Sequence, residues 1–285
     1  MAGFVLGDNQ YGKAETRLVR VDRDTGVHRI TDLNVSTTLA GDLAATHLTG
    51  DNSGVLPTDT QKNTVYAFAR DGVGEIEDFA LRLARHFVDS APTITRARVR
   101  IEQYGWDRLA DHSFRRGAGT RTATATYDGT GSWLVSGVQD LVVLNTTGSE
   151  FHGFHKDRYT TLAETTDRIL ATAVTARWRH AATTGVDWAS SFDEATRHLL
   201  AAFADTHSLS LQQTLHAMGE RVLANRPEVA EVQLALPNRH HFLVDLAPFG
   251  LDNPGEVFHA ADRPYGLIEG TVLRADAPEP GLAWW

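Results

Sequence analysis

The alternation of apolar and polar residues near the start of the chain predicts two strands. β-Branched residues interleave with polar ones over 17–21 and again over 27–35, and successive side chains of a strand face opposite sides. Between them, Arg23-Asp24-Thr25-Gly26 predicts a hairpin turn. The period then changes to that of a helix over 74–89, whose apolar face comprises Ile76, Phe79, Ala80, Leu83 and Phe87.

The other predicted elements repeat this order in each half of the chain. A first helix is expected from Thr58-Asp59, two cap-type side chains that follow Pro57. Strands of the first half are expected over 96–103, 120–127 and 132–138. The second half is predicted to contain strands over 141–144, 171–178, 229–236, 242–246 and 267–273, and helices over 193–204 and 209–224.

Each half therefore contains strands, a pair of helices and further strands. This order is typical of an antiparallel sheet with helices on one face, so the predicted fold class is α+β. The boundary is expected near Gly137-Val138, without a Pro- or Ser-rich linker. We therefore predict two tandem domains, 1–138 and 139–285.

Composition narrows the function classes. The 285 residues carry a net charge of −9, which argues against a nucleic-acid-binding protein. The chain has no cysteine, which excludes disulfides, thiolate catalysis and cysteine zinc sites. Apolar runs fall short of the ~20 residues of a membrane helix. The residues after Met1 lack a basic stretch and an apolar core, so we expect a cytoplasmic protein with no secretory signal.

Motifs for binding a metal or a phosphate are weak. His152 and His155 are spaced i, i+3 without an acidic partner, and we expect them on the surface. His240 and His241 are adjacent on a predicted strand, so they point to opposite faces and cannot readily share one ion. Gly-x-Gly patterns precede strands, or precede a helix that begins with acidic residues. We predict no metal site and no phosphate loop.

The segment 144–162 is rich in hydroxyl and aromatic side chains and leads on to Asp167-Arg168. A polar, aromatic stretch between strands is typical of a binding site. The alternative is a loop followed by a helix from Thr160, with Asp167-Arg168 on its surface. Asn9-Gln10-Tyr11-Gly12-Lys13 is a second unusual segment, because it places one of only three lysines beside a glycine at a strand entry.

These segments resemble the urate oxidase (uricase) family. The signature is Leu144-x-x-Thr147-x-Ser149-x-Phe151-x-x-Phe154-x-x-Asp157-x-x-Thr160-Thr161-Leu162-x-x-Thr165-x-Asp167-Arg168-x-x-x-Thr172. Four further segments agree, in the family's order: Tyr11-Gly12-Lys13, Thr58-Asp59-Thr60-Gln61-Lys62-Asn63-Thr64, Ser210-Leu211-Gln212 and Pro237-Asn238-Arg239-His240. The sequence departs from the family at Leu211, where valine is frequent, and at His241, where an aromatic residue is common.

The resemblance implies a tunnelling fold (T-fold) of two similar domains, each an antiparallel sheet with a helix pair on one face. It implies a homotetramer around a central tunnel, with active sites at subunit interfaces. The reaction would convert urate, O₂ and water to 5-hydroxyisourate and hydrogen peroxide, a step of purine degradation. The family uses neither a metal nor an organic cofactor.

The resemblance also implies roles for individual residues. Phe151 matches the aromatic ring that stacks on urate. Arg168 matches the guanidinium that binds one edge of urate, and Gln212 matches the amide that pairs with the opposite edge. Beside Gln212, Leu211 would supply a backbone or apolar contact. Asn238 matches the amide that would hold O₂ and then water. Thr58 and Asp59 match residues that the neighbouring chain contributes to the site. Lys13, Thr58 and His240 match the catalytic proton relay.

Two other functions stay open at this point. One is another T-fold enzyme acting on a purine or pterin with a histidine-bound zinc, which a chelator would inactivate. The other is a purine-binding module without catalysis, which would not consume urate.

Overall fold

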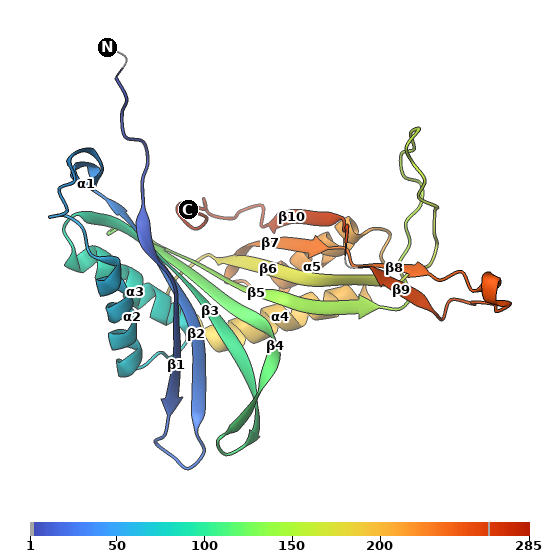
Figure 1. The fold of residues 1–285 in the computed structure, drawn as a ribbon, viewed down its shortest axis with the longest axis horizontal. Helices are drawn as coiled ribbons and strands as arrows, with labels where there is room; N and C mark the ends of the chain where they lie inside the picture. The colour runs from blue at the N-terminus through green and yellow to red at the C-terminus, as the bar shows by residue number, and fades with distance from the viewer. Residues whose placement is uncertain (1–2, 262) are drawn as a thin grey trace. The chain divides into compact units, whose positions relative to one another are not determined.

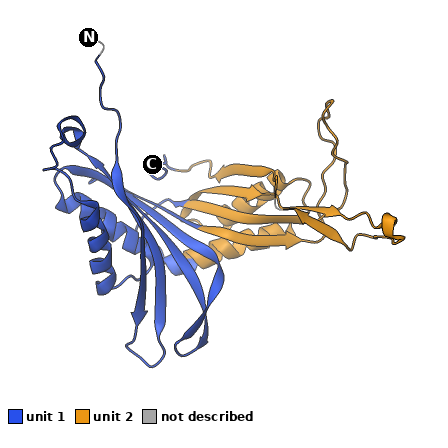
Figure 2. Cartoon of the chain, in the orientation of Figure 1, with its two compact units in different colours: residues 1–137, 179–190, 278–285 blue, residues 138–178, 191–277 orange. Residues whose placement is uncertain are grey.

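The computed structural model describes residues 3–261 and 263–285. It divides into two compact units, coloured separately in Figure 2. Unit 1 extends to Gly137 and includes Arg179–Ser190 and Pro278–Trp285, whereas unit 2 comprises Val138–Trp178 and Ser191–Ala277. Unit 1 therefore includes two segments from late in the sequence, whereas the expected ranges 1–138 and 139–285 are each continuous. The division into tandem domains stays a prediction.

Unit 1 is built on long strands that follow each other in space as in sequence (Figure 1). The strands are β1 (Tyr11–Asp22), β2 (Arg29–Gly41), β3 (Ile94–Ala110), β4 (Ser113–Tyr127) and the first part of β5 (Ser132–Asn145). The pairs β1–β2, β2–β3 and β3–β4 are antiparallel. This confirms the predicted hairpin at the start of the chain.

Three helices accompany this sheet: α1 (Ala44–Thr49), α2 (Thr58–Asp71) and α3 (Ile76–Ser90). The predicted apolar face of α3 is confirmed, because all five of its residues are fully buried. They belong to one core with Val99, Ile101, Ala123 and Ala125 of the sheet. The short helix α1 was not predicted, since it buries no residue and so leaves no apolar period.

Unit 2 contains the second part of β5, followed in spatial order by β6 (Leu170–His180), β7 (Val229–Pro237) and β10 (Leu267–Leu273). Its helices are α4 (Trp188–Asp205), of which unit 2 holds the part from Ser191, and α5 (Leu211–Asn225). Trp178 is fully buried and shares a core with Leu199, Met218 and Val232. A separate two-stranded sheet joins β8 (His240–Leu243) to β9 (Phe258–Ala261), and a 3₁₀ turn, η1 (Ala247–Phe249), lies between them in sequence.

One predicted boundary within the sheet is wrong. The expected strands over 132–138 and 141–144 form a single strand, β5. Asp140 lies inside it at φ +57°, a left-handed conformation uncommon for a residue other than glycine. Such a residue shifts the alternation of faces, which made one strand resemble two.

In the described part of the chain, the helices are too short or too polar to cross a membrane.

Gly12 determines how closely β1 approaches β2. Its partner across the ladder is Thr38, and a Cβ added to Gly12 would lie 1.8 Å from the carbonyl oxygen of Thr37. No side chain fits at that distance, so any larger residue must push the two strands apart. Glycine is therefore required at this position by the backbone of the neighbouring strand.

We expect Gly12→Ala to destabilise the protein by about 3 kcal/mol, the upper end of the usual range for overpacking, because the clash here displaces backbone and not a flexible side chain. The measurement is thermal or denaturant unfolding. Gly105→Ala in β3 is the matched control, since a Cβ there meets nothing within 4 Å. Equal stability of the two variants would contradict this account.

Candidate active site

The first group of predicted site residues lies in unit 1. Lys13 is half-buried on β1, opposite Thr37 of β2, immediately before an irregularity in the ladder. Within that irregularity Glu15 has φ +56°. A bulge of this kind re-aims the strand's side chains next to functional sites.

Thr58 and Asp59 form the first turn of α2. The helix begins at Thr58 as predicted, but its N-cap is Pro57 and no side chain caps it. The two residues therefore do not act as caps, and the proline with its preset φ provides the start instead. Their side chains remain available for other contacts, and Thr58 is half-buried whereas Asp59 is exposed.

Asp59 connects this turn to nearby charges. Its carboxylate accepts hydrogen bonds from Lys62 Nζ at 2.5 Å and Asn63 Nδ2 at 3.0 Å. The bond from Lys62 is the main reason that the pKa of Asp59 is lowered, and the charge of Lys13 lowers this pKa further. Lys13 and the start of α2 thus share one electrostatic environment.

The second group lies in unit 2 and centres on Phe151. Backbone bonds in both directions pair Phe151 with Thr165, at 2.8 and 3.0 Å. The ring of Phe154 stacks on that of Phe151 with centroids 5.0 Å apart. Arg168 Cζ lies 5.2 Å from the centroid of the Phe151 ring. A flat ring and a flat cation are therefore held side by side.

The guanidinium of Arg168 is half-buried, and burial lowers its pKa. Its Nε donates to Ser149 Oγ at 3.2 Å. Among the residues that the structure describes, no carboxylate lies within ion-pair distance of it. Burying an uncompensated charge is costly, so such a guanidinium is suited to binding an anion.

Side-chain hydrogen bonds hold the loop around Arg168. Asp167 Oδ1 accepts from Thr147 Oγ1 at 2.9 Å and from the Gly148 N–H at 3.2 Å. The alternative of a helix from Thr160 is wrong, because residues 152–164 form turns and irregular backbone with no helix. The hydroxyl-rich composition that suggested a site therefore serves to tie down a loop.

The first turn of α5 joins the same region. Ser149 and Ser208 form a parallel bridge, and Ser210 caps the helix by accepting from the Gln213 N–H. Gln212 is exposed, so its amide is free to meet a ligand. Leu211 is only 2% exposed and belongs to the core of unit 2, so it offers a ligand its backbone and not its side chain.

Asn238 and His240 follow the end of β7. Asn238 bridges Thr172, and its N–H donates to the carbonyl of Gly266 at 2.8 Å. His240 is half-buried, and this burial lowers its pKa, which the charge of Arg168 lowers further. A histidine in this setting is held neutral and can accept a proton.

The nine predicted residues therefore form two groups: Lys13, Thr58 and Asp59 in unit 1, and Phe151, Arg168, Leu211, Gln212, Asn238 and His240 in unit 2. Sequence reasoning missed the supports Ser149 and Phe154 as individual residues, although both lie in the signature. It also assigned no individual role to Thr172, which is the last residue of that signature.

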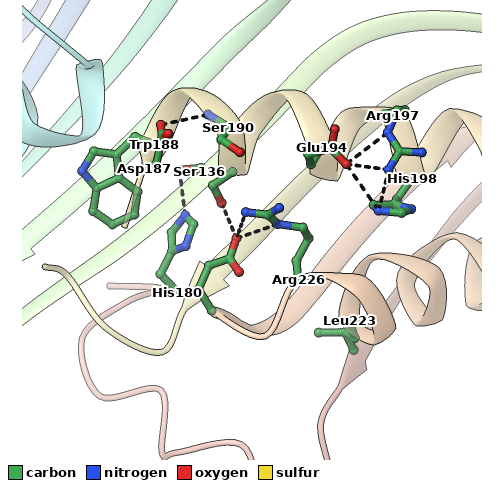
Figure 3. Close-up of polar contacts among 12 residues, drawn as sticks. Ser136, His180, Asp187, Trp188, Ser190, Glu194, Arg197, His198, Leu223 and Arg226 are labelled. Atoms are coloured by element: carbon green, nitrogen blue, oxygen red, sulfur yellow. Dashed lines mark hydrogen bonds and ion pairs between the residues drawn. The ribbon is translucent and has the colours of Figure 1, made fainter. Parts of the chain in front are cut away.

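A buried polar cluster elsewhere in unit 1 does not form a second site. Figure 3 shows His180 bonded to Ser136, with Nε2 and Oγ 2.9 Å apart. Ser136 donates in turn to Glu77 Oε1 at 2.7 Å, and Glu77 also pairs with Arg121. Burial raises the pKa of Glu77. Because these groups are enclosed by the core, a substrate cannot reach the hydroxyl.

His152 and His155 are both exposed, as predicted, and His152 has a structural partner. His152 Nε2 lies 2.8 Å from Glu150 Oε2, and His207 contacts the other oxygen of that carboxylate. Within residues 3–261 and 263–285, no three side chains of His, Asp or Glu are arranged to hold a metal ion.

An α+β fold that holds an aromatic ring beside a half-buried guanidinium with no carboxylate partner in the described residues is of a class suited to binding a flat anion. The Uricase family model matches residues 9–129 and 134–269. The uricase of Arthrobacter globiformis is 55% identical over 283 residues, covering 98% of this chain and 93% of that protein. The uricase of Dictyostelium discoideum is 37% identical, covering 95% and 98%.

Solved structures agree with this match. The crystal structure of uricase from Arthrobacter globiformis has a TM-score of 0.95 with 54% identity, and each chain covers 98% of the other. Urate oxidase from Bacillus sp. TB-90 shares the fold at a TM-score of 0.80 and 23% identity, with 93% of this chain and all of that chain (100%) covered. The chain belongs to the uricase family and has its tunnelling fold.

We expect Arg168→Met to raise the pKa of His240 towards the ordinary histidine value. A nearby positive charge disfavours the protonated ring, so removing that charge favours it. The measurement is an NMR titration of the His240 ring, assigned with His240→Asn. Arg158→Met, which removes an exposed charge from the same loop, should leave the titration unchanged. An unaltered His240 pKa in Arg168→Met would refute the coupling.

Proposed function

We propose that this protein is a urate oxidase that converts urate, O₂ and water to 5-hydroxyisourate and hydrogen peroxide. Membership of the uricase family supports the activity. The observation that carries it is the Arg168 guanidinium, half-buried beside the Phe151 ring and without a carboxylate partner in the described residues. Urate is flat and anionic, so it complements both groups. No observation favours the zinc enzyme or the non-catalytic module.

The binding residues would grip urate along its edges. The forked guanidinium of Arg168 can bond one edge with two parallel N–H groups, which a lysine could not reproduce. Gln212 presents both a donor and an acceptor to the opposite edge. At the start of α5, where Leu211 lies, the backbone N–H groups lack intrahelical partners and can add a further contact. Phe151 would stack on the purine face.

The reaction also needs a group that removes a proton. O₂ is a triplet and reacts slowly with closed-shell molecules, so the substrate must first become electron-rich. Lys13 would take the proton through the hydroxyl of Thr58. Urate would then give two electrons to O₂, which takes up one proton returned by the relay and one from solvent and leaves as hydrogen peroxide. Water would add to the oxidised ring. Asn238 would hold O₂ and then water, with His240 accepting the water's proton.

The complete site would form between two copies of the chain, within a homotetramer. Thr58 and Asp59 of one copy would face the Arg168 group of the next. The placement of the predicted residues in two units supports this arrangement.

A cytoplasmic location also stays a prediction.

The direct test of the proposed function is to follow urate by its ultraviolet absorbance and hydrogen peroxide by a coupled assay. We expect one peroxide for each urate consumed, with activity retained in a chelator. Binding of urate without consumption would establish the non-catalytic module instead. Loss of activity on chelation that zinc restores would favour the metal enzyme.

We expect Lys13→Met to lower kcat by about 10² or more, because general base catalysis contributes about that factor. Binding of a urate analogue that cannot be oxidised should change little, since the gripping edges belong to unit 2. Lys156→Met, in an exposed loop, is the matched control. Wild-type turnover in a folded Lys13→Met protein would remove Lys13 from the mechanism.

Mixed oligomers test the shared site. Inactive Thr58→Ala chains combined with inactive Arg168→Ala chains should regain activity, because some interfaces then contain two intact groups. Thr58→Ala combined with Lys13→Met is the control that should stay inactive, since both lesions affect the same group. If differently tagged chains co-purify as mixed oligomers without activity, the shared-site arrangement is wrong.

A further inference from the structure

Two buried polar side chains, one on β2 and one on α2, connect the segments that carry the first group of site residues. Thr37 of β2 is 3% exposed, and Gln61 of α2 is fully buried. A buried hydroxyl or amide is costly unless it is hydrogen-bonded. Both are satisfied here, and their partners connect the strand that carries Lys13 to the segment that leads to Thr58.

The hydrogen bonds run in one direction. The N–H of Lys13 donates to Thr37 Oγ1 at 3.2 Å, and Thr37 Oγ1 donates to Gln61 Oε1 at 2.6 Å. Gln61 Nε2 then donates to the carbonyl of Leu56 at 3.3 Å. Each group donates onward to the next, an order in which neighbouring bonds strengthen one another.

Tyr11 closes this series of hydrogen bonds into a ring, because it bonds Leu56 at one end and the backbone of β1 joins it to Lys13 at the other. Its hydroxyl donates to the carbonyl of Leu56 at 2.9 Å and accepts from the Leu56 N–H at 3.0 Å. Burial raises the pKa of Tyr11, so the phenol remains a donor in neutral solution. Tyr11 precedes Lys13 by two residues, and Leu56 precedes Thr58 by two.

The ring is placed where the regular β1–β2 ladder ends, directly after Lys13. The β1–β2 register shifts between Lys13 and Thr16, so ladder bonds alone do not define the strand there. Towards α2, the helix has no side-chain cap to hold its first turn. The buried hydroxyl and amide supply the missing connection.

From this geometry we infer that Thr37 and Gln61 are positioning residues, which hold Lys13 and Thr58 in the mutual geometry that proton transfer requires. The inference rests on the proposed urate oxidation, in which these two residues form the relay. Neither Thr37 nor Gln61 needs to touch substrate. Small displacements of a catalytic group cost large factors in rate, so the effect should fall on kcat.

The test compares Thr37→Val and Gln61→Met, which retain volume and remove the hydrogen bonds. We expect each to lower kcat by about 10- to 100-fold. Affinity for a non-oxidisable urate analogue should stay within about two-fold of wild type, because the gripping edges are elsewhere. Thr37→Ser, which keeps the hydroxyl, should restore most of the rate.

Thr38→Val is the matched control. It makes the same chemical change one residue along β2, where the side chain faces the other side of the sheet. It should leave kcat unchanged. Wild-type kcat in folded Thr37→Val and Gln61→Met, or a fall in kcat matched by an equal loss of analogue affinity, would overturn the inference.

A second measurement does not depend on activity. The backbone amide of Lys13 should exchange its hydrogen at least about ten-fold faster in Thr37→Val than in wild type, since its acceptor is gone. Unchanged protection of this amide would overturn the inference even in an active protein. If the wild-type chain consumes no urate, the proposed function fails, while this exchange experiment still decides whether the ring positions Lys13.

Discussion

The half-buried charge of Arg168 is the constraint on which the arrangement of unit 2 depends. A guanidinium removed from water is stable only if its surroundings satisfy it, and here Ser149 and the Phe151 ring do so in part. The loop that carries it is anchored through Asp167 and the bridge to Ser208. Burial lowers the pKa of His240, and the charge of Arg168 lowers it further, so this half-buried cation also acts on the histidine of the same unit.

In unit 1 the corresponding feature is the placement of Lys13, a long and flexible side chain, on β1. Gly12 permits a close approach of two backbones that any Cβ would prevent. The strand then leaves its regular ladder just after Lys13, and hydrogen bonds through Thr37 replace the lost order. Lys13 is thus placed at the end of the regular part of β1, where its charge lowers the pKa of Asp59.

Much of this was predictable because the signals are local. The apolar face of α3 repeats every turn, and Phe79 and Phe87 are buried as predicted. The signature around Phe151 and Arg168 identified the family, since its residue types and spacings are specific. The predictions that failed concern long-range or exceptional features. Two expected strands form one strand, β5, which contains Asp140 in a left-handed conformation. Helix α2 begins directly after Pro57 and is not capped by the side chain of Thr58 or Asp59.

By itself, the sequence predicted the order of the main strands and helices and identified the family, because periodicity and motif spacing are properties of neighbouring positions. Only the tertiary structure decided that Thr37 meets Gln61. It likewise decided that Arg168 is half-buried and not on a helix surface. These outcomes depend on strand register and on packing between distant segments, and no local pattern encodes which buried polar groups will find each other.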